Sequence, residues 1–178
     1  INNEEDRPGV TSCIMKPDDA ITHINDVTAD GPISVVGVAG PGDSLANEET
    51  FEFFEKLAVE QPDLIKCMST NGLLLPKYAD KLAELGVNSV TVTINAVDPA
   101  IAENIYSFIK YEGKVYKGRE AVEILIKNQL DGVEKAEQSY AKAGVELYNI
   151  QKWGKYSFAD SDEALEEAAW VVKKIAPY

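Results

Sequence analysis

Short apolar runs alternate with longer amphipathic segments along most of this chain, and this alternation limits the fold more than any other feature. The apolar runs are rich in β-branched residues and end at Gly, Asn, Asp or Pro, which is typical of buried strands. They cover residues 33–39, 64–70, 88–95 and 145–150. Helical patterns cover residues 17–27, 48–60, 77–85, 99–109, 118–143 and 161–175. This order predicts an α/β fold of parallel βαβ units with right-handed crossovers.

Two local signals support the predicted helix ends. Asn47 stands directly before residues 48–60 and is a favourable N-cap, whereas Gly144 stands where the helix of residues 118–143 should stop. Residues 111–118, with the sequence YEGKVYKG, are predicted to be an exposed connection.

The chain is acidic, with 30 acidic and 17 basic residues and a formal net charge of −13. This charge repels polyanions and argues against nucleic acid or an anionic membrane as the main partner. No apolar run approaches the roughly 20 residues of a membrane span, and no signal segment opens the sequence. The two cysteines are too few for a disulfide framework. We therefore expect a cytoplasmic protein in a reducing compartment.

Each predicted strand is followed by small, polar residues. In an α/β sheet of this kind, ligands bind outside the carboxyl ends of the strands. The pattern therefore predicts a site for a polar, roughly neutral ligand. At or just past the strand ends, the residues are Gly40, Gly42 and Asp43 for the first strand, Ser69, Thr70 and Asn71 for the second, Thr93 and Asn95 for the third, and Asn149 and Gln151 for the fourth.

The loop AGPGD after the first strand lacks the signatures of the known phosphate-binding loops. It has neither the Gly-Lys-Ser/Thr ending of a Walker loop nor the three spaced glycines of a dinucleotide fingerprint. Its glycines let the backbone approach a ligand closely, and Asp43 could accept hydrogen bonds from an ammonium group. The alternative is a plain turn in which Asp43 caps the following helix, and these residues alone leave both interpretations open.

Cysteine and histidine offer few candidates for metal ligation. Cys67 lies within a predicted strand, where a buried structural cysteine is the default and an iron ligand is the alternative. Cys13 has no partner at ligand spacing, and His23 is expected to be a packed or surface residue. Glu4 and Glu5 lie in an acidic cluster that is usually a solvated end, and no hydrolase triad is present.

Several segments, taken in chain order, resemble the NifB family of radical S-adenosylmethionine (SAM) enzymes, which makes the iron–sulfur precursor of the nitrogenase cofactor. The resemblance runs from Arg7 to Gly118 and resumes near Gly144. The segments are RPGVTS, VVGVAGPGDSLAN, LIKCMSTNGLLLP, VTVTINAVDP, IYSFIKYEGKVYKG and LYNI.

The resemblance implies a role for each candidate residue. Cys67 would ligate one of the substrate [4Fe–4S] clusters, and Glu5, or alternatively Glu4, would be the catalytic carboxylate that faces a cluster. The remaining residues would bind SAM. Gly40, Gly42 and Asp43 would hold its methionine amino group, Ser69, Thr70, Asn71, Thr93 and Asn95 would approach its carboxylate and ribose, and Asn149 and Ile150 would lie beside its adenine.

The chain also departs from the family pattern. The Cys-x-x-x-Cys-x-x-Cys motif for the SAM-reducing cluster is absent, as are the upstream His and Cys ligands and a strand–helix unit before VELYNI. Either the sequence is part of a longer enzyme whose cluster-binding segments are left out, or it is a shortened relative. Abrupt joins at motif edges favour the first explanation, because losing a central βα unit would open the core.

Residues 1–178 are therefore expected to form an incomplete radical SAM core, an α/β fold built as a partial (βα) TIM-like barrel. The resemblance implies a lyase-type radical SAM enzyme that fuses two [4Fe–4S] clusters and inserts a SAM-derived carbide. Its cofactors would be SAM and a SAM-reducing [4Fe–4S] cluster. Its partners would be an iron–sulfur cluster donor, cofactor carrier or scaffold proteins and an electron donor, with no nucleic acid and no membrane.

These 178 residues alone are expected to be inactive, because they lack the motif that delivers the electron. A first alternative is a non-catalytic carrier with a decayed radical SAM fold that binds SAM or an iron–sulfur cluster. A second is a barrel lyase with a Schiff-base lysine. It ranks last because Lys66, within a predicted strand, is not at a strand end.

Overall fold

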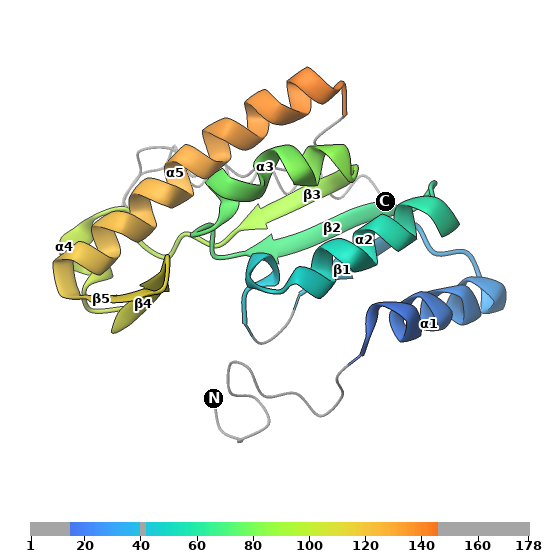
Figure 1. Ribbon diagram of the computed structural model, residues 1–178, viewed down its shortest axis with the longest axis horizontal. Helices are drawn as coiled ribbons and strands as arrows, with labels where there is room; N and C mark the ends of the chain where they lie inside the picture. The colour runs from blue at the N-terminus through green and yellow to red at the C-terminus, as the bar shows by residue number, and fades with distance from the viewer. Residues whose placement is uncertain (1–14, 40–41, 146–178) are drawn as a thin grey trace, which may run out of the picture.

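The structure is a computed structural model that describes residues 15–39 and 42–145. The order of elements in this part of the chain is labelled in Figure 1. The elements are α1 (Pro17–Asp30), β1 (Val35–Val38), the 3-10 helix η2 (Ser44–Ala46), α2 (Glu48–Glu60), β2 (Ile65–Thr70), α3 (Leu75–Glu84), β3 (Val87–Val92), α4 (Pro99–Ala102), β4 (Phe108–Tyr111), β5 (Lys114–Lys117) and α5 (Gly118–Ala143).

The predicted parallel α/β sheet is confirmed in the described residues. Strands β1, β2 and β3 lie side by side in sequence order, and all are parallel. One register row joins Val38, Met68 and Val90 across the three strands. Helix α2 connects β1 to β2, and α3 connects β2 to β3, so each connection is a βαβ crossover.

The helices cover one face of this sheet. Met68 and Val90 are completely buried on that face, in one cluster with Phe54 and Leu57 of α2. Burying each such side chain stabilises the fold by about 1.5–3 kcal/mol. On the opposite face, Val35 keeps 53% of its surface exposed. The described sheet therefore has a covered face and an open face.

Helix α5 runs along α3, as Figure 1 shows, and packs closely against it. Gly132 makes this approach possible, because a Cβ there would lie 2.8 Å from the Cβ of Leu75. Near the end of α5, the buried Tyr140 hydroxyl donates a 2.6 Å hydrogen bond to the Val87 carbonyl at the start of β3. These contacts fix α5 against both the helix layer and the sheet.

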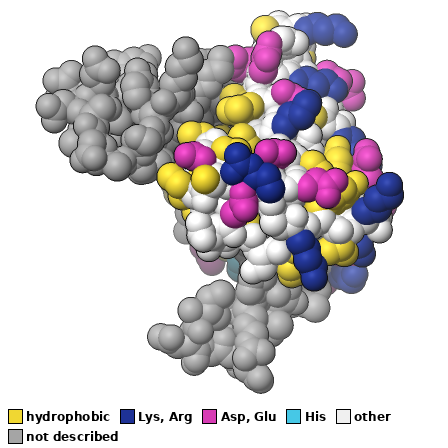
Figure 2. All heavy atoms as spheres, turned by 90° about the vertical axis from the view of Figure 1, so that its left-hand side faces the viewer, with side chains coloured by type: hydrophobic (Ala, Val, Ile, Leu, Met, Phe, Trp, Pro, Cys, Tyr) yellow, Lys and Arg dark blue, Asp and Glu magenta, His cyan; other side chains and the backbone are white. Residues whose placement is uncertain are grey.

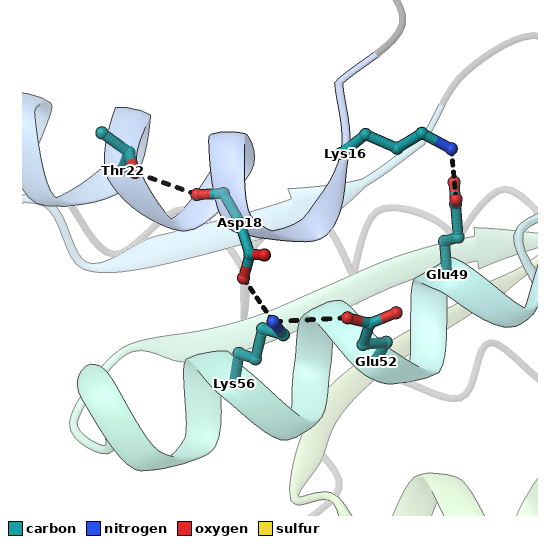
Figure 3. A network of polar contacts seen from close by, with 6 residues as sticks. All are labelled: Lys16, Asp18, Thr22, Glu49, Glu52 and Lys56. Atoms are coloured by element: carbon teal, nitrogen blue, oxygen red, sulfur yellow. Dashed lines mark hydrogen bonds and ion pairs between the residues drawn. The ribbon is translucent and has the colours of Figure 1, made fainter.

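Helix α1 is joined to α2 by surface ion pairs in addition to its apolar contacts (Figure 3). Lys56 pairs with Asp18 of α1 and lies 3.3 Å from Glu52 one turn away, while Lys16 lies 2.5 Å from Glu49. Exposed pairs of this kind contribute about 0–1 kcal/mol each. The apolar side chains of α1 therefore carry most of its attachment.

Two sequence predictions are wrong. The helix predicted for residues 99–109 ends at Ala102, and Phe108 begins a strand. The predicted connection at residues 111–118 contains β5, which pairs antiparallel with β4. The loop between these strands is Glu112-Gly113, with φ values of 49° and 77°, as the type I′ turn of a two-residue hairpin requires.

Other boundaries differ less. β3 ends at Val92, three residues before the predicted end, and α1 and α3 are longer or shifted by a few residues. The predicted bounds of α2 and α5 are confirmed. The predicted strand at residues 145–150 and helix at 161–175 lie outside the described residues, apart from Val145. In residues 15–39 and 42–145, no helix has the length and apolar character needed to span a membrane.

Candidate functional site

The carboxyl ends of β1 and β2 are joined by the Asp43 side chain. Its carboxylate accepts hydrogen bonds from the Thr70 hydroxyl at 2.9 and 3.0 Å and from the Asn71 amide at 2.5 Å. It also accepts from the Leu45 amide at 3.0 Å and so caps η2. Capping was one of the two interpretations open from the sequence, and the geometry confirms that contact.

Protein donors contact both oxygens of the Asp43 carboxylate. A carboxylate has about four acceptor sites, and those of Asp43 are contacted by the Leu45 amide, by the Asn71 amide and, on both oxygens, by the Thr70 hydroxyl. The side chain is half-buried at the end of the sheet. Because the Thr70 hydroxyl has a single proton for its two contacts, a ligand N–H can replace one of them, and the ligand-binding interpretation is compatible with the cap.

Gln129 of α5 holds the ends of β2 and β3 together, and sequence reasoning missed it. Its amide nitrogen Nε2 donates to the Asn71 carbonyl at 2.7 Å and to the Thr93 carbonyl at 3.1 Å. The side chain is only 1% exposed. A signal was present in the sequence, since Gln129 stands at the four-residue spacing between Leu125 and Val133 on the buried face of α5.

Gly72 completes this connection between the strand ends. Its φ is +82°, and a Cβ there would lie 2.8 Å from Val92 and 2.9 Å from the Gln129 side chain. Its amide donates to the Thr70 hydroxyl at 3.1 Å. Only glycine fits this conformation and this space without strain. The backbone after β2 is therefore closely constrained.

Ser69 and Thr93 carry hydroxyl groups that remain available at these strand ends. Ser69 is half-buried and Thr93 is exposed. Neither side chain makes a hydrogen bond to another residue in the described part of the chain, although the Thr93 backbone bonds Thr70 and Gln129. Their hydroxyl groups can therefore bind a ligand without breaking an existing contact.

Asn95 lies further out, where it donates to the Tyr106 hydroxyl at 2.8 Å. Tyr106 also lines a cleft of about 290 Å³ together with Asp43, Asn71 and the first residues of β4. This volume is near the lower limit for small-molecule sites, about 300 Å³. Strand β4 thus forms one wall of the cleft, a role that the helix predicted for residues 99–109 did not reveal.

Cys67 lies in the middle of β2, on the open face of the sheet, with Ser69 on the same face nearer the carboxyl end. Its register neighbours are Gly37 on β1 and Ser89 on β3. Both neighbours are small, and Cys67 itself is half-buried. Within the described ranges, no three His, Cys, Asp or Glu side chains gather as a metal site, so Cys67 offers one ligand.

Lys66 points to the covered face, opposite to Cys67, and is 5% exposed. Burial lowers the pKa of its amino group. This position gives no support to the Schiff-base alternative, because the side chain does not face the strand-end site.

His23 is exposed on α1 and lines a separate cleft of about 430 Å³ between α1, β1 and the start of α2.

The remaining predicted site residues are only partly described. Gly42 is exposed, with a φ of +106° that favours glycine. Several candidates lie outside the described residues, so their predicted roles stay predictions. These are Glu4, Glu5, Cys13, Gly40, Asn149, Ile150 and Gln151.

Comparisons with known proteins show the family to which this chain belongs. The family model of the radical SAM superfamily matches residues 7–135. A FeMo cofactor biosynthesis protein NifB of Methanocaldococcus jannaschii is 53% identical over 133 residues, which cover 74% of this chain and 44% of that protein. The protein of the same name in Methanocaldococcus infernus is 47% identical over 135 residues, which cover 75% of this chain and 45% of that protein.

A third relative, the FeMo cofactor biosynthesis protein NifB of Frankia alni, is 48% identical over 131 residues, which cover 72% of this chain and 26% of that protein. The chain therefore spans less than half the length of these relatives. The matched region contains the described strand ends and Cys67.

Proposed function

Because this chain belongs to the radical SAM superfamily, we propose that the carboxyl ends of β1, β2 and β3 bind SAM in a NifB-type enzyme of FeMo cofactor biosynthesis. The observation that carries this proposal is the half-buried Asp43 carboxylate at the ends of β1 and β2, together with the hydroxyl groups of Ser69 and Thr93, which have no hydrogen-bond partner among the described residues. These groups lie in the part of the chain that the superfamily model matches.

The residues at the strand ends fit the chemistry of SAM. Its methionine part carries an ammonium group, which would donate to the Asp43 carboxylate in a charge-assisted hydrogen bond. Its carboxylate and ribose hydroxyl groups would be bound by Ser69, Thr70, Asn71, Thr93 and Asn95. When bound, SAM supplies a methyl group and a 5′-deoxyadenosyl group for radical chemistry. The protein binds it, orients its reactive bonds and excludes water.

The fold of this chain is proposed to be a partial (βα) TIM-like barrel of the radical SAM type. Support comes from the sequential order of the parallel strands and from the helices, which cover one face of the described sheet. In a barrel, such a sheet curves so that its open face becomes the interior. Cys67 and Ser69 would then face the interior, where a ligand above the strand ends can reach them.

Iron–sulfur clusters enter this proposal as substrate and as a resident cofactor. The SAM-reducing cluster would be held by the three cysteines of the family motif, and the described residues include no group of three side chains that could hold it. Cys67 is proposed to ligate one of two [4Fe–4S] substrate clusters. Their fusion and the insertion of a SAM-derived carbide are proposed from the similarity to NifB proteins.

Glu5, or alternatively Glu4, is proposed as the catalytic carboxylate that faces a substrate cluster. Gly40, Gly42, Asn149 and Ile150 are proposed to complete the SAM site, as the family pattern implies. Iron–sulfur cluster donors, cofactor carrier or scaffold proteins and an electron donor are its proposed partners. The 178 residues alone are proposed to be inactive, since they contain only two cysteines.

Equilibrium dialysis with labelled SAM tests the site. Ser69→Ala and Thr93→Val each remove one hydroxyl group that has no other described partner, so protein stability should not change. A lost hydrogen bond of about 0.5–1.5 kcal/mol corresponds to roughly two- to twelve-fold weaker binding. Ser34→Ala, an exposed serine before β1 at the other end of the sheet, is the matched control and should bind SAM as the parent does.

Equal SAM affinity in the parent and both site variants would refute the strand-end site. A second measurement separates the enzyme from the carrier alternative. The anaerobically prepared protein with its complete cluster-binding segments should form 5′-deoxyadenosine from SAM in the presence of a reductant. SAM binding without 5′-deoxyadenosine would support the carrier.

A further inference from the structure

The β4–β5 hairpin has a packed face and an outward face. On the packed face, Ile109 is buried in a cluster with α5, and the half-buried Tyr116 is its cross-strand partner. The outward face consists of two cross-strand pairs, Phe108 with Lys117 and Lys110 with Val115. Phe108 is 60% exposed and Val115 is 58% exposed. The outward face therefore mixes exposed apolar and cationic side chains.

The lysines of the hairpin differ from most other cations of the described chain. Lys110, Lys114 and Lys117 form no ion pair with a described residue. In contrast, Lys16, Lys56, Lys81, Arg119, Lys127 and Lys135 all have carboxylate partners. The hairpin thus concentrates cations without carboxylate partners in one place.

This concentration stands out against the charge of the chain. Residues 108–119 contain four basic residues and one acidic residue, while the chain carries a net charge of −13. Figure 2, which faces the end of the molecule that carries the hairpin, shows basic and hydrophobic side chains there, with acidic side chains among them. A local field of opposite sign steers an acidic partner to one part of a surface.

The outward face is adjacent to the candidate SAM site. Phe108 and Lys110 line the same 290 Å³ cleft as Asp43 and Asn71. A protein seated on the outward face would therefore lie next to the strand ends. Such a position suits a protein that delivers electrons to the site.

We propose that the outward face of the hairpin, defined by Phe108, Lys110, Val115 and Lys117 with the neighbouring Lys114, is the docking surface for a small acidic electron-carrier protein. This inference rests on the proposed function, which requires an electron donor. The surface is a small apolar patch surrounded by lysines, and transient redox encounters bury less than about 1,200 Å². A nucleic acid or membrane would meet the repulsion of the remaining acidic surface.

Binding of an acidic [2Fe–2S] ferredoxin tests the proposal, with thermophoresis as the readout at low and at physiological salt. The double variant Lys114→Gln/Lys117→Gln should bind at least fivefold more weakly at low salt, and Val115→Ser should also weaken binding. The matched control is Lys81→Gln/Lys142→Gln, which removes the same charge from α3 and the far end of α5. This control should change binding less than twofold.

Three results would overturn the docking surface. They are equal binding by the parent and the hairpin variant, equal weakening by the control variant, or a dimer of the parent that the hairpin variant dissociates. SAM dialysis with the same variants separates this proposal from the proposed function. If the hairpin variant loses ferredoxin binding but still binds SAM, the docking surface is supported. If the parent does not bind SAM, the proposed function is refuted, and the ferredoxin result alone decides on the docking surface.

Discussion

Replacement of Gln129 by Met tests how the strand-end site is built. Met has a similar length and fits an apolar environment, but it cannot donate to the Asn71 and Thr93 carbonyls. We expect the variant to be less stable and to bind SAM more weakly, because the ends of β2 and β3 lose the hydrogen bonds that join them through Gln129.

The magnitude follows from the two lost hydrogen bonds. Each contributes about 0.5–1.5 kcal/mol, and a buried carbonyl left unpaired costs about 1–3 kcal/mol. Asn71 and Thr93 are exposed residues, so water can reach their carbonyls and the lower values apply. The free energy of unfolding should therefore fall by about 1–3 kcal/mol. A change of this size is measurable by urea denaturation.

The matched control is Gln138→Met on the same helix. Gln138 is exposed and donates only to Glu134, one turn away, at 3.3 Å. Its replacement should change stability by less than about 0.5 kcal/mol. If Gln129→Met and Gln138→Met have the same urea midpoint, Gln129 does not hold the strand ends and our description of the site fails.

Other parts of the structure give further predictions. Gly72→Ala should destabilise the protein by about 1–3 kcal/mol more than Gly86→Ala, because both glycines have positive φ but only a Cβ at Gly72 would contact Val92. Equal urea midpoints for Gly72→Ala and Gly86→Ala would contradict this clash. Tyr140→Phe should lower the free energy of unfolding by about 1–2 kcal/mol, because it removes the hydrogen bond to the Val87 carbonyl. Burial raises the pKa of Tyr140. As the pH rises, the tyrosine of the unfolded chain therefore ionises before that of the folded chain. The free energy of unfolding should fall above about pH 10, and it should fall more steeply in the parent than in Tyr140→Phe. If the free energy of unfolding falls equally with pH in the parent and in Tyr140→Phe, this linkage is excluded. Cys67→Ser should lower the iron bound per chain after anaerobic reconstitution without changing the melting temperature, and unchanged iron would indicate a structural cysteine.

Elements with strong local signals could be predicted from the sequence. The bounds of α2 and α5 agree because Asn47 accepts from the Glu49 amide as an N-cap and Gly144 ends α5 with a φ of +67°. Such signals depend on a few neighbouring residues. They do not require knowledge of the tertiary fold.

Strand β4 was missed because the residues that lead into it fit a helical pattern. Ile101, Ile105 and Ile109 recur every four residues, which favours a helix. The structure buries Ile109 between the exposed Phe108 and Lys110, which is the alternation of a strand. The Glu-Gly turn and the packing of the hairpin against α5 decide between the two patterns.

The candidate site could be predicted in position but not in construction. Asp43, Thr70 and Asn71 follow strands whose carboxyl ends meet, so their proximity could be derived from the sequence. Gln129 lies 36 residues along the chain from Thr93 and 58 from Asn71. Its contact depends on how α5 packs, which no local pattern specifies.

Hydrogen–deuterium exchange with and without SAM tests the central claim most directly, namely that the strand carboxyl ends bind this ligand. The account predicts slower exchange on SAM addition in residues 42–47, 69–74 and 93–96, with no change at Ser34 before β1. Protection confined to the cleft that His23 lines between α1, β1 and α2, or no protection in the presence of saturating SAM, would contradict it.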